Sequence, residues 1–190
     1  LNTEVTPELV EIANPDVLLV AVGAQPIVPA IPGVAKGSVL MAAAAHAPDA
    51  SVGERVVVIG GGQVGCETGL HLAQAGKDVT IVEMLDEVAP DANIMHRRGL
   101  LLELQKAVNV RTGLTCMEIT DSGVVVEDAS GGRTTLPCDS VVIAVGYRPC
   151  TELVDALRES APEVMVIGDC VKPRRVISAV RTGYDAAMSI

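Results

Sequence analysis

The chain has 190 residues and a formal net charge of −10, and 49% of its residues are hydrophobic although Phe and Trp are absent. An acidic surface is unfavourable for binding nucleic acids or anionic membranes, because both carry negative charge. No apolar run reaches the roughly 18 residues that a membrane-spanning helix needs, and the first ten residues lack the basic start of a signal peptide. We therefore expect an aliphatic core and neither a nucleic-acid nor a membrane partner.

The cysteines and histidines carry no recognisable redox or metal motif. Five cysteines without a CxxC pair fit a disulfide framework poorly, so we expect a reducing, cytoplasmic compartment. The three histidines lack metal-ligand spacing, and we expect no metal site. Because the chain starts at Leu1 rather than Met, we expect a fragment of a longer protein.

The first part of the chain predicts a strand followed by a connector. The apolar run Asp16–Val22 stops at the turn signal Gly23-Ala24-Gln25-Pro26, which predicts a buried strand. Three prolines between positions 26 and 33 exclude a helix interior and predict an extended connector. The alanines of Ala42–Ala45 predict a short helical turn.

The strongest pattern is a strand, a glycine turn, a helix and a second strand within about thirty residues. The apolar strand Arg55–Ile59 leads directly into Gly60-Gly61-Gly62-Gln63-Val64-Gly65. A helix is predicted over Gln63–Ala75, ended by Gly76, and a strand over Asp78–Glu83. This order predicts an α/β fold with a Rossmann-like βαβ parallel sheet.

The later part of the chain predicts further helices and strands. Apolar residues at helical spacing predict a helix over Ala92–Ala107, and a strand follows at Val108–Arg111. Three short runs separated by glycine turns predict an antiparallel β-meander: Met117–Thr120, Val124–Glu127 and Thr134–Leu136. We expect two more strands, then a final helix with Pro173 in its first turn: Asp139–Val145, Val164–Ile167 and 173–188.

Two segments share one pattern, an apolar strand followed by Gly-x-x-Pro. They are Leu19–Pro26 and Val142–Pro149. The shared pattern predicts two related chain crossovers.

The spacing Gly60-x-Gly62-x-x-Gly65 satisfies the fingerprint of a dinucleotide-binding turn. Gly60 permits the tight turn, Gly62 leaves the backbone open to a pyrophosphate, and Gly65 lets the helix pack closely on the strand. The backbone N–H groups at the start of the helix, at Gln63 and Val64, then attract phosphate charge. The alternative is a turn with a structural role alone.

Glu83 ends the second strand, 18 residues after Gly65. Its carboxylate can accept both ribose hydroxyls of an adenosine and would repel a 2′-phosphate, so we predict NAD(H) rather than NADP(H). The alternative is a solvated charge at a strand end. Cys66 has no histidine beside it to activate it and is expected to be a packing residue. Glu67, on the first turn of the helix, either interacts favourably with the helix dipole alone or lies near a nicotinamide.

Several segments together resemble a known family. Val56–Met84 resembles the NAD-binding domain of two-dinucleotide-domain flavoprotein reductases. Ala21–Pro26 with Ile31-Pro32-Gly33 resembles the ATGA-x-P…IPG crossover of that family, and Val166–Asp169 resembles its Gly-Asp motif. Gly168–Arg175 and Gly183–Ala187 are similar to the C-terminal part of 2,4-dienoyl-CoA reductases, NADH oxidases and trimethylamine dehydrogenases.

The resemblance implies two dinucleotide-binding domains, one of them truncated. Residues 51–140 would form an NAD(H)-binding domain inserted between two segments of an FAD-binding domain, 1–50 and 141–190. Gly146 would lie near the nicotinamide, and four residues would contact FAD: Gly23, Ala24, Gly168 and Asp169. As alternatives, Gly23 and Gly146 are turns alone and Asp169 caps the last helix.

Parts of that family's pattern are missing from this sequence. It contains no N-terminal FMN barrel, no cysteine cluster for an iron–sulfur centre, no first glycine fingerprint and no CxxxxC redox pair. We therefore expect an inactive, NADH-binding fragment of an FAD-dependent oxidoreductase, with no catalytic side chain and with the missing flavin barrel as its partner. The cofactors would perform the redox chemistry. Alternatives are a non-catalytic NAD-sensing or interaction module and another flavoprotein reductase branch; a homo-oligomer is also open.

Overall fold

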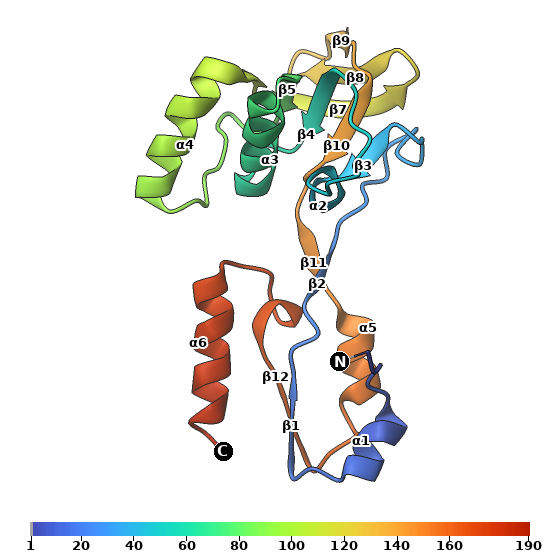
Figure 1. Cartoon of the computed structure of the whole chain (residues 1–190), viewed down its shortest axis with the longest axis vertical. Coiled ribbons are helices and arrows are strands. Elements are labelled where there is room, and N and C mark those ends of the chain that lie inside the picture. Colours follow the sequence, from blue (N-terminus) through green and yellow to red (C-terminus); the bar gives the residue numbers. More distant parts are fainter. Residues whose placement is uncertain (1) are drawn as a thin grey trace. The chain divides into compact units, whose positions relative to one another are not determined.

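The computed structural model describes residues 2–190 and divides them into two compact units (Figure 1). One unit is Pro26–Gly146, and the other joins the residues up to Gln25 to Tyr147–Ile190. Each unit has a hydrophobic core of its own. Within the described residues, no helix combines the length and apolar character needed to cross a membrane.

The unit Pro26–Gly146 is built on a parallel sheet in which β4 (Arg55–Ile59) is the central strand. On either side of β4 lie β10 (Ser140–Ile143) and β5 (Asp78–Val82), and the outer strands are β3 (Val39–Met41) and β6 (Asn109–Arg111). The register sets Ile59 opposite both Ile143 and Val82. The carboxyl ends of three adjacent strands therefore meet at one edge of the sheet.

Three helices cover one face of this sheet (Figure 1): α2 (Ala42–Ala45), α3 (Gln63–Gln74) and α4 (Ile94–Ala107). Val56 and Val58 of β4 point toward them, because alternate residues of a strand face the same side. Helix α3 lies very close to β5: a Cβ at Gly69 would be 2.9 Å from Cδ1 of Ile81. Aliphatic side chains thus pack under the helices without an aromatic residue.

An antiparallel meander covers the opposite face: β7 (Leu114–Thr120), β8 (Gly123–Asp128) and β9 (Arg133–Leu136). Val57 and Ile59 of β4 pack against the meander, whose buried residues include Ile119 and Val124. Both faces of the parallel sheet are therefore covered, which explains the aliphatic runs of β4 and β10. The predicted α/β fold with a parallel sheet and a β-meander is confirmed.

The second unit is smaller and contains a parallel pair, β1 (Val17–Val20) with β12 (Glu163–Val166). Around the pair lie three helices and a short 3-10 turn: α1 (Pro7–Ala13), α5 (Thr151–Leu157), η1 (Gly168–Cys170) and α6 (Val176–Ala187). Its core is formed by five buried residues: Val10, Val20, Val154, Leu157 and Cys170.

The two predicted crossovers form strands that pair with each other. These strands are β2 (Ala24–Pro26) and β11 (Tyr147–Pro149). Each follows a glycine with a positive φ angle, +75° at Gly23 and +105° at Gly146. The repeated Gly-x-x-Pro pattern therefore marks the two segments through which the chain leaves the smaller unit and later returns to it.

The sequence-based prediction missed α1, β3, α5 and η1, and it took the segments of β2 and β11 as turns. The start of α1 had a readable signal, because the Thr6 side chain accepts a hydrogen bond from the Leu9 N–H group and Pro7 occupies the first helical position. The final helix begins at Val176, after an extended Arg175, so Pro173 lies before it rather than in its first turn.

The limits of the compact units lie at Gln25/Pro26 and Gly146/Tyr147, while the segment limits expected at 50/51 and 140/141 stay a prediction. The physical reason is that β3 pairs with β10 and that Ala42 and Ala45 of α2 join the core beneath the helices. The connector 26–50 therefore packs with the central sheet.

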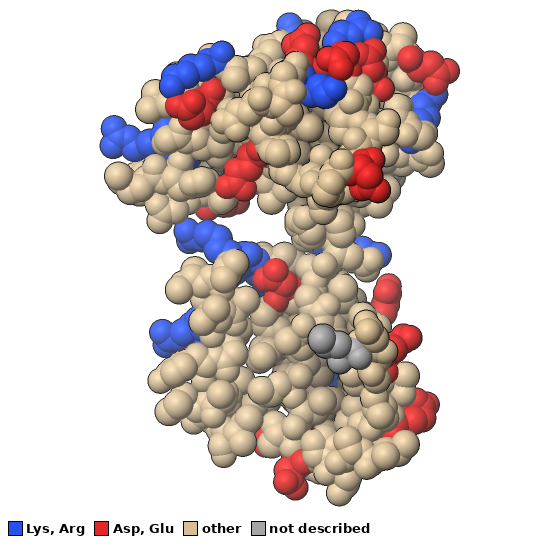
Figure 2. Space-filling view, in the orientation of Figure 1, with Lys and Arg blue, Asp and Glu red and all other residues tan. Residues whose placement is uncertain are grey.

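Acidic and basic side chains are interspersed over the surface of the unit Pro26–Gly146 in the view of Figure 2. Several form ion pairs between segments distant in sequence, such as Arg55 with Asp139 at 2.7 Å and Lys77 with Glu54 at 2.9 Å. The Arg55 guanidinium lowers the pKa of the Asp139 carboxyl through their hydrogen bond. Exposed pairs of this kind contribute little to stability, so the buried aliphatic layers carry the fold.

Replacing Ile81 by Ala tests this packing. Ile81 has 0% exposure beneath α3, and its truncation should lower the free energy of unfolding by roughly 2–5 kcal/mol in urea denaturation. Leu102→Ala is a matched control on α4, because Leu102 is 59% exposed; its effect should stay below about 0.5 kcal/mol. Similar losses in both variants would contradict the described core.

Candidate functional site

The loop Gly60–Gly65 lies at the carboxyl ends of the central strands. The Gly60 N–H group donates to the Val82 carbonyl at 2.9 Å, which ties the loop to the end of β5. On the other side, the Ala144 N–H group, just after β10, donates to the Ile59 carbonyl at 2.8 Å. Open α/β sheets bind ligands at this edge.

Gly60 and Gly65 are glycines for steric reasons. Gly60 has a φ angle of +106°, and a Cβ there would lie 2.5 Å from the Ala144 carbonyl oxygen. A Cβ at Gly65 would lie 1.9 Å from the Gly60 carbonyl oxygen. The first turn of α3 therefore touches the bend that follows β4, and neither position has room for a side chain. The tight turn and the close helix packing are the structural roles predicted for them.

Gly62 differs from both of these glycines. Its φ angle of −64° is ordinary, and no atom lies within 4 Å of the place where a Cβ would stand. It is the N-cap of α3, and no side chain caps the helix there among the residues that the structure describes. The first N–H groups of a helix attract anions, so the space in front of Gly62 suits a phosphate group.

Glu83 is turned toward the glycine loop. Its side chain is buried, and its Oε2 accepts a hydrogen bond from the Gly61 N–H group at 2.6 Å while Oε1 accepts one from Leu85 N–H at 2.8 Å. It is therefore not a solvated charge at a strand end. A carboxylate offers about four acceptor positions, so each oxygen can still accept one further hydrogen bond, as two ribose hydroxyls would require.

Gly61, which the fingerprint leaves unspecified, is held by hydrogen bonds and by close packing. Its carbonyl accepts hydrogen bonds from the Ala89 N–H group at 2.7 Å and from the Cys66 thiol at 3.3 Å. A Cβ at Gly61 would lie 2.7 Å from Cγ1 of Val88 and 2.8 Å from Cβ of Glu83. Sequence reasoning missed this residue, although three consecutive glycines offered a signal.

The Cys66 thiol is buried and inert. Burial, together with the charges of Glu83 and Glu67, raises its pKa to about 11. A thiol with this pKa is almost entirely protonated at neutral pH, and only a thiolate is a good nucleophile. Cys66 is a packing residue, as predicted, that also donates a hydrogen bond to the loop.

The polar side chains on the first turns of α3 interact with one another. Gln63 Nε2 donates to Glu67 Oε1 at 2.9 Å, and His96 Nε2, from α4, lies 2.8 Å from the same oxygen. The Gln63 side chain therefore faces Glu67, and what Gln63 offers a phosphate is its backbone N–H group. Val64 is 41% exposed beside it.

The candidate residues in the smaller unit gather at one end of the β1–β12 pair. Val20 and Val166 are paired in register, so Gly23 and Gly168 both follow strands at their carboxyl ends. The Gly168 N–H group donates to Thr182 Oγ1 at 2.9 Å, and Asp169 Oδ1 accepts from the Arg174 N–H group at 3.3 Å. Ala24 lies in β2 after the left-handed Gly23, and Asp169 bonds ahead of α6 rather than capping it.

Gly146 belongs to the other unit and follows β10. Its φ angle is +105°, and its carbonyl accepts a hydrogen bond from Ile27 N–H at 3.0 Å. Ala144, two residues earlier, contacts Gly60. The structure thus brings the end of β10 and the glycine loop together.

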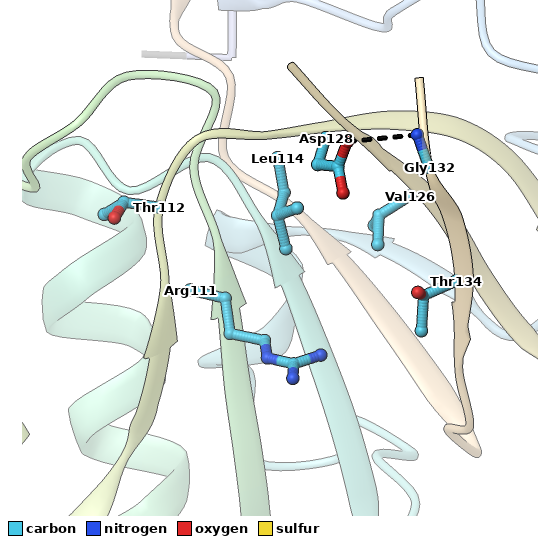
Figure 3. Close-up of a pocket in the computed structure, with 7 residues that line it drawn as sticks. All are labelled: Arg111, Thr112, Leu114, Val126, Asp128, Gly132 and Thr134. Atoms are coloured by element: carbon cyan, nitrogen blue, oxygen red, sulfur yellow. Dashed lines mark hydrogen bonds between the residues drawn. The ribbon is translucent and has the colours of Figure 1, made fainter. Parts of the chain in front are cut away.

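A separate depression of about 380 Å³ lies between the end of β6 and the meander (Figure 3). Its lining combines polar and apolar side chains: Arg111, Thr112, Leu114, Val126, Asp128, Gly132 and Thr134. Asp128 Oδ1 accepts hydrogen bonds from the N–H groups of Ser130 and Gly132, so its carboxylate stabilises the β8–β9 turn. None of the candidate residues on the glycine loop lines this depression.

Known proteins are similar to this chain in sequence and in fold. The chain is 35% identical over 189 residues to an NADH oxidase of Thermoanaerobacter brockii, a match covering 96% of the chain and 29% of that protein. It is 39% identical over 182 residues to a bilirubin reductase of Mediterraneibacter gnavus, covering 95% and 28%. The solved structure of a 2-naphthoyl-CoA reductase complex superposes with a TM-score of 0.92 at 33% identity, covering 100% of the chain and 29% of that structure.

The chain thus spans less than a third of the length of these relatives. Residues 5–183 match the pyridine nucleotide-disulphide oxidoreductase family. This range extends over residues of both units and contains the glycine loop. The chain therefore belongs to the pyridine nucleotide-disulphide oxidoreductase family.

Proposed function

We propose that this chain binds NADH at the glycine loop and belongs to an FAD-dependent oxidoreductase, in which it positions the nicotinamide for hydride transfer to the flavin. The observation that carries the proposal is the buried Glu83 carboxylate, 2.6 Å from the Gly61 N–H group and beside the open space at Gly62. Relatives named NADH oxidase, bilirubin reductase and cinnamate reductase support an oxidoreductase role.

The residues on this edge of the sheet fit a dinucleotide. The diphosphate would lie against Gly62 and the N–H groups of Gln63, Val64 and Gly65, where the positive end of α3 favours negative charge. Bound NADH would supply the hydride and FAD would accept it. The chain itself contributes binding and orientation, and no side chain is needed as an acid, a base or a nucleophile.

Glu83 would set the preference for NADH over NADPH. Its two carboxylate oxygens each have one remaining acceptor position for the adenosine ribose. A 2′-phosphate at the same place would bring a second negative charge against a buried carboxylate, and charges of like sign repel most strongly away from water. We therefore assign the preference to the charge of Glu83.

The smaller unit would bind FAD. Gly23, Ala24, Gly168 and Asp169 lie at the carboxyl end of the β1–β12 pair, the edge at which such sheets bind cofactors. Segments 1–50 and 141–190 would then be parts of an FAD-binding domain. Residues 51–140 would form the NAD(H)-binding domain, and Gly146 would lie near the nicotinamide. We further propose that the parent protein has an FMN barrel and an iron–sulfur centre elsewhere. Its role would be like that of 2,4-dienoyl-CoA reductase.

Substitution of Gly62 tests the site. Gly62→Val should abolish NADH binding in a fluorescence titration, because the side chain would occupy the place of the diphosphate. Since no atom lies within 4 Å of that Cβ position, the variant should fold, with only the small loss of thermal midpoint that a poorer N-cap residue causes. Gly99→Ala, at an equally open position on α4, is the control and should bind NADH as the unaltered chain does. Undiminished affinity in folded Gly62→Val would count against the assigned loop.

Substitution of Glu83 tests the nucleotide preference. Glu83→Ala should raise the Kd for NADH roughly ten- to hundredfold, since it removes charge-assisted hydrogen bonds worth roughly 1.5–3 kcal/mol. It should also narrow the preference for NADH over NADPH. Asp86→Ala removes an exposed acid from the same connection and should change neither value. If the unaltered chain already prefers NADPH, the role given to Glu83 is wrong.

A further inference from the structure

The connection between β5 and α4 is hydrogen-bonded to the glycine loop through Ala89, a residue with a strained backbone. The Ala89 N–H group donates to the Gly61 carbonyl at 2.7 Å, and Ala89 has a φ angle of +49° with 0% exposure. This left-handed conformation is unfavourable for a residue that has a Cβ. Alanine keeps it only where surrounding contacts hold the backbone in place.

Arg97, on the first turn of α4, supplies such contacts. Its Nε and Nη2 atoms donate to the Val88 carbonyl at 3.2 and 3.0 Å, and Nη2 also donates to Glu87 Oε2 at 2.6 Å. The planar guanidinium thus fixes both the backbone and a side chain immediately before Ala89. Its side chain is only 27% exposed, so these hydrogen bonds are partly shielded from water.

The contacts continue from Arg97 to the carboxylate of Glu83. Gly61 is held on one side by Ala89 and on the other by Glu83 Oε2, 2.6 Å from its N–H group. Val88 closes the space around Gly61, because a Cβ there would be 2.7 Å from Cγ1 of Val88. A shift of the backbone at 88–89 would therefore displace Gly61 and release the Glu83 carboxylate from its present orientation.

We propose that Arg97 is a positioning residue that fixes the orientation of Glu83, and hence the preference for NADH over NADPH, without touching the nucleotide. Arg97 acts on Val88 and Ala89, which hold Gly61, which in turn holds Glu83. This inference rests on the proposed NADH site, to which it adds a residue that determines specificity from a neighbouring helix.

The experiment compares three variants of the whole chain by titration with NADH and with NADPH. Arg97→Met removes the hydrogen bonds and should raise the Kd for NADH about tenfold, with a smaller change for NADPH, so that the ratio of the two affinities narrows. Arg97→Lys keeps the charge and can donate to Val88 but lacks the planar fork, so its ratio should be intermediate. Arg98→Met removes an exposed neighbouring charge and should leave both affinities unchanged.

The outcomes separate this inference from the proposed function. If the unaltered chain prefers NADH and the ratio stays the same in Arg97→Met, the inference is overturned while the site stands. An equal loss for both nucleotides would mean that Arg97 only supports the fold, and would also overturn it. If Arg97→Met does not fold, the ratio in Arg97→Lys decides. Binding of neither nucleotide by the unaltered chain would overturn the proposed function, and the inference with it.

Discussion

Helix α3 can touch the bend after β4 because Gly65 has no side chain; a Cβ there would stand 1.9 Å from the Gly60 carbonyl oxygen. The rest of the arrangement depends on this contact. It holds the first turn of the helix at the carboxyl end of the central strand, where Gly60 is also bonded to Val82 of β5. The start of α3, whose first N–H groups have no partner within the helix, is thereby fixed beside Glu83, the residue that follows β5.

Two opposite electrostatic features result from this placement. The start of α3 is positive and open in front of Gly62, whereas Glu83 places a buried negative charge next to it. An anionic diphosphate suits the first and uncharged ribose hydroxyls suit the second. An adenine dinucleotide without a 2′-phosphate, the ligand that we propose, carries both of these groups. The membership of the chain in the pyridine nucleotide-disulphide oxidoreductase family agrees with this chemistry.

Local sequence signals predicted the parts of the fold that depend on periodicity or on glycine. The βαβ unit, the meander and the two Gly-x-x-Pro crossovers all follow from short patterns. The strand β3 did not, because three apolar residues become a strand only by pairing with β10, about 100 residues later. The sequence likewise indicated Glu83 but not Ala89 or Arg97. A left-handed alanine and a side chain bonded to the Val88 carbonyl leave no local sequence pattern.

The most direct test of the account follows backbone amide signals by nuclear magnetic resonance while NADH is added to the isotope-labelled chain. We expect the largest shifts at 60–65 and at Glu83–Leu85, where the diphosphate and the ribose would lie. Shifts concentrated instead around Arg111 and Thr134, in the depression of Figure 3, would contradict it.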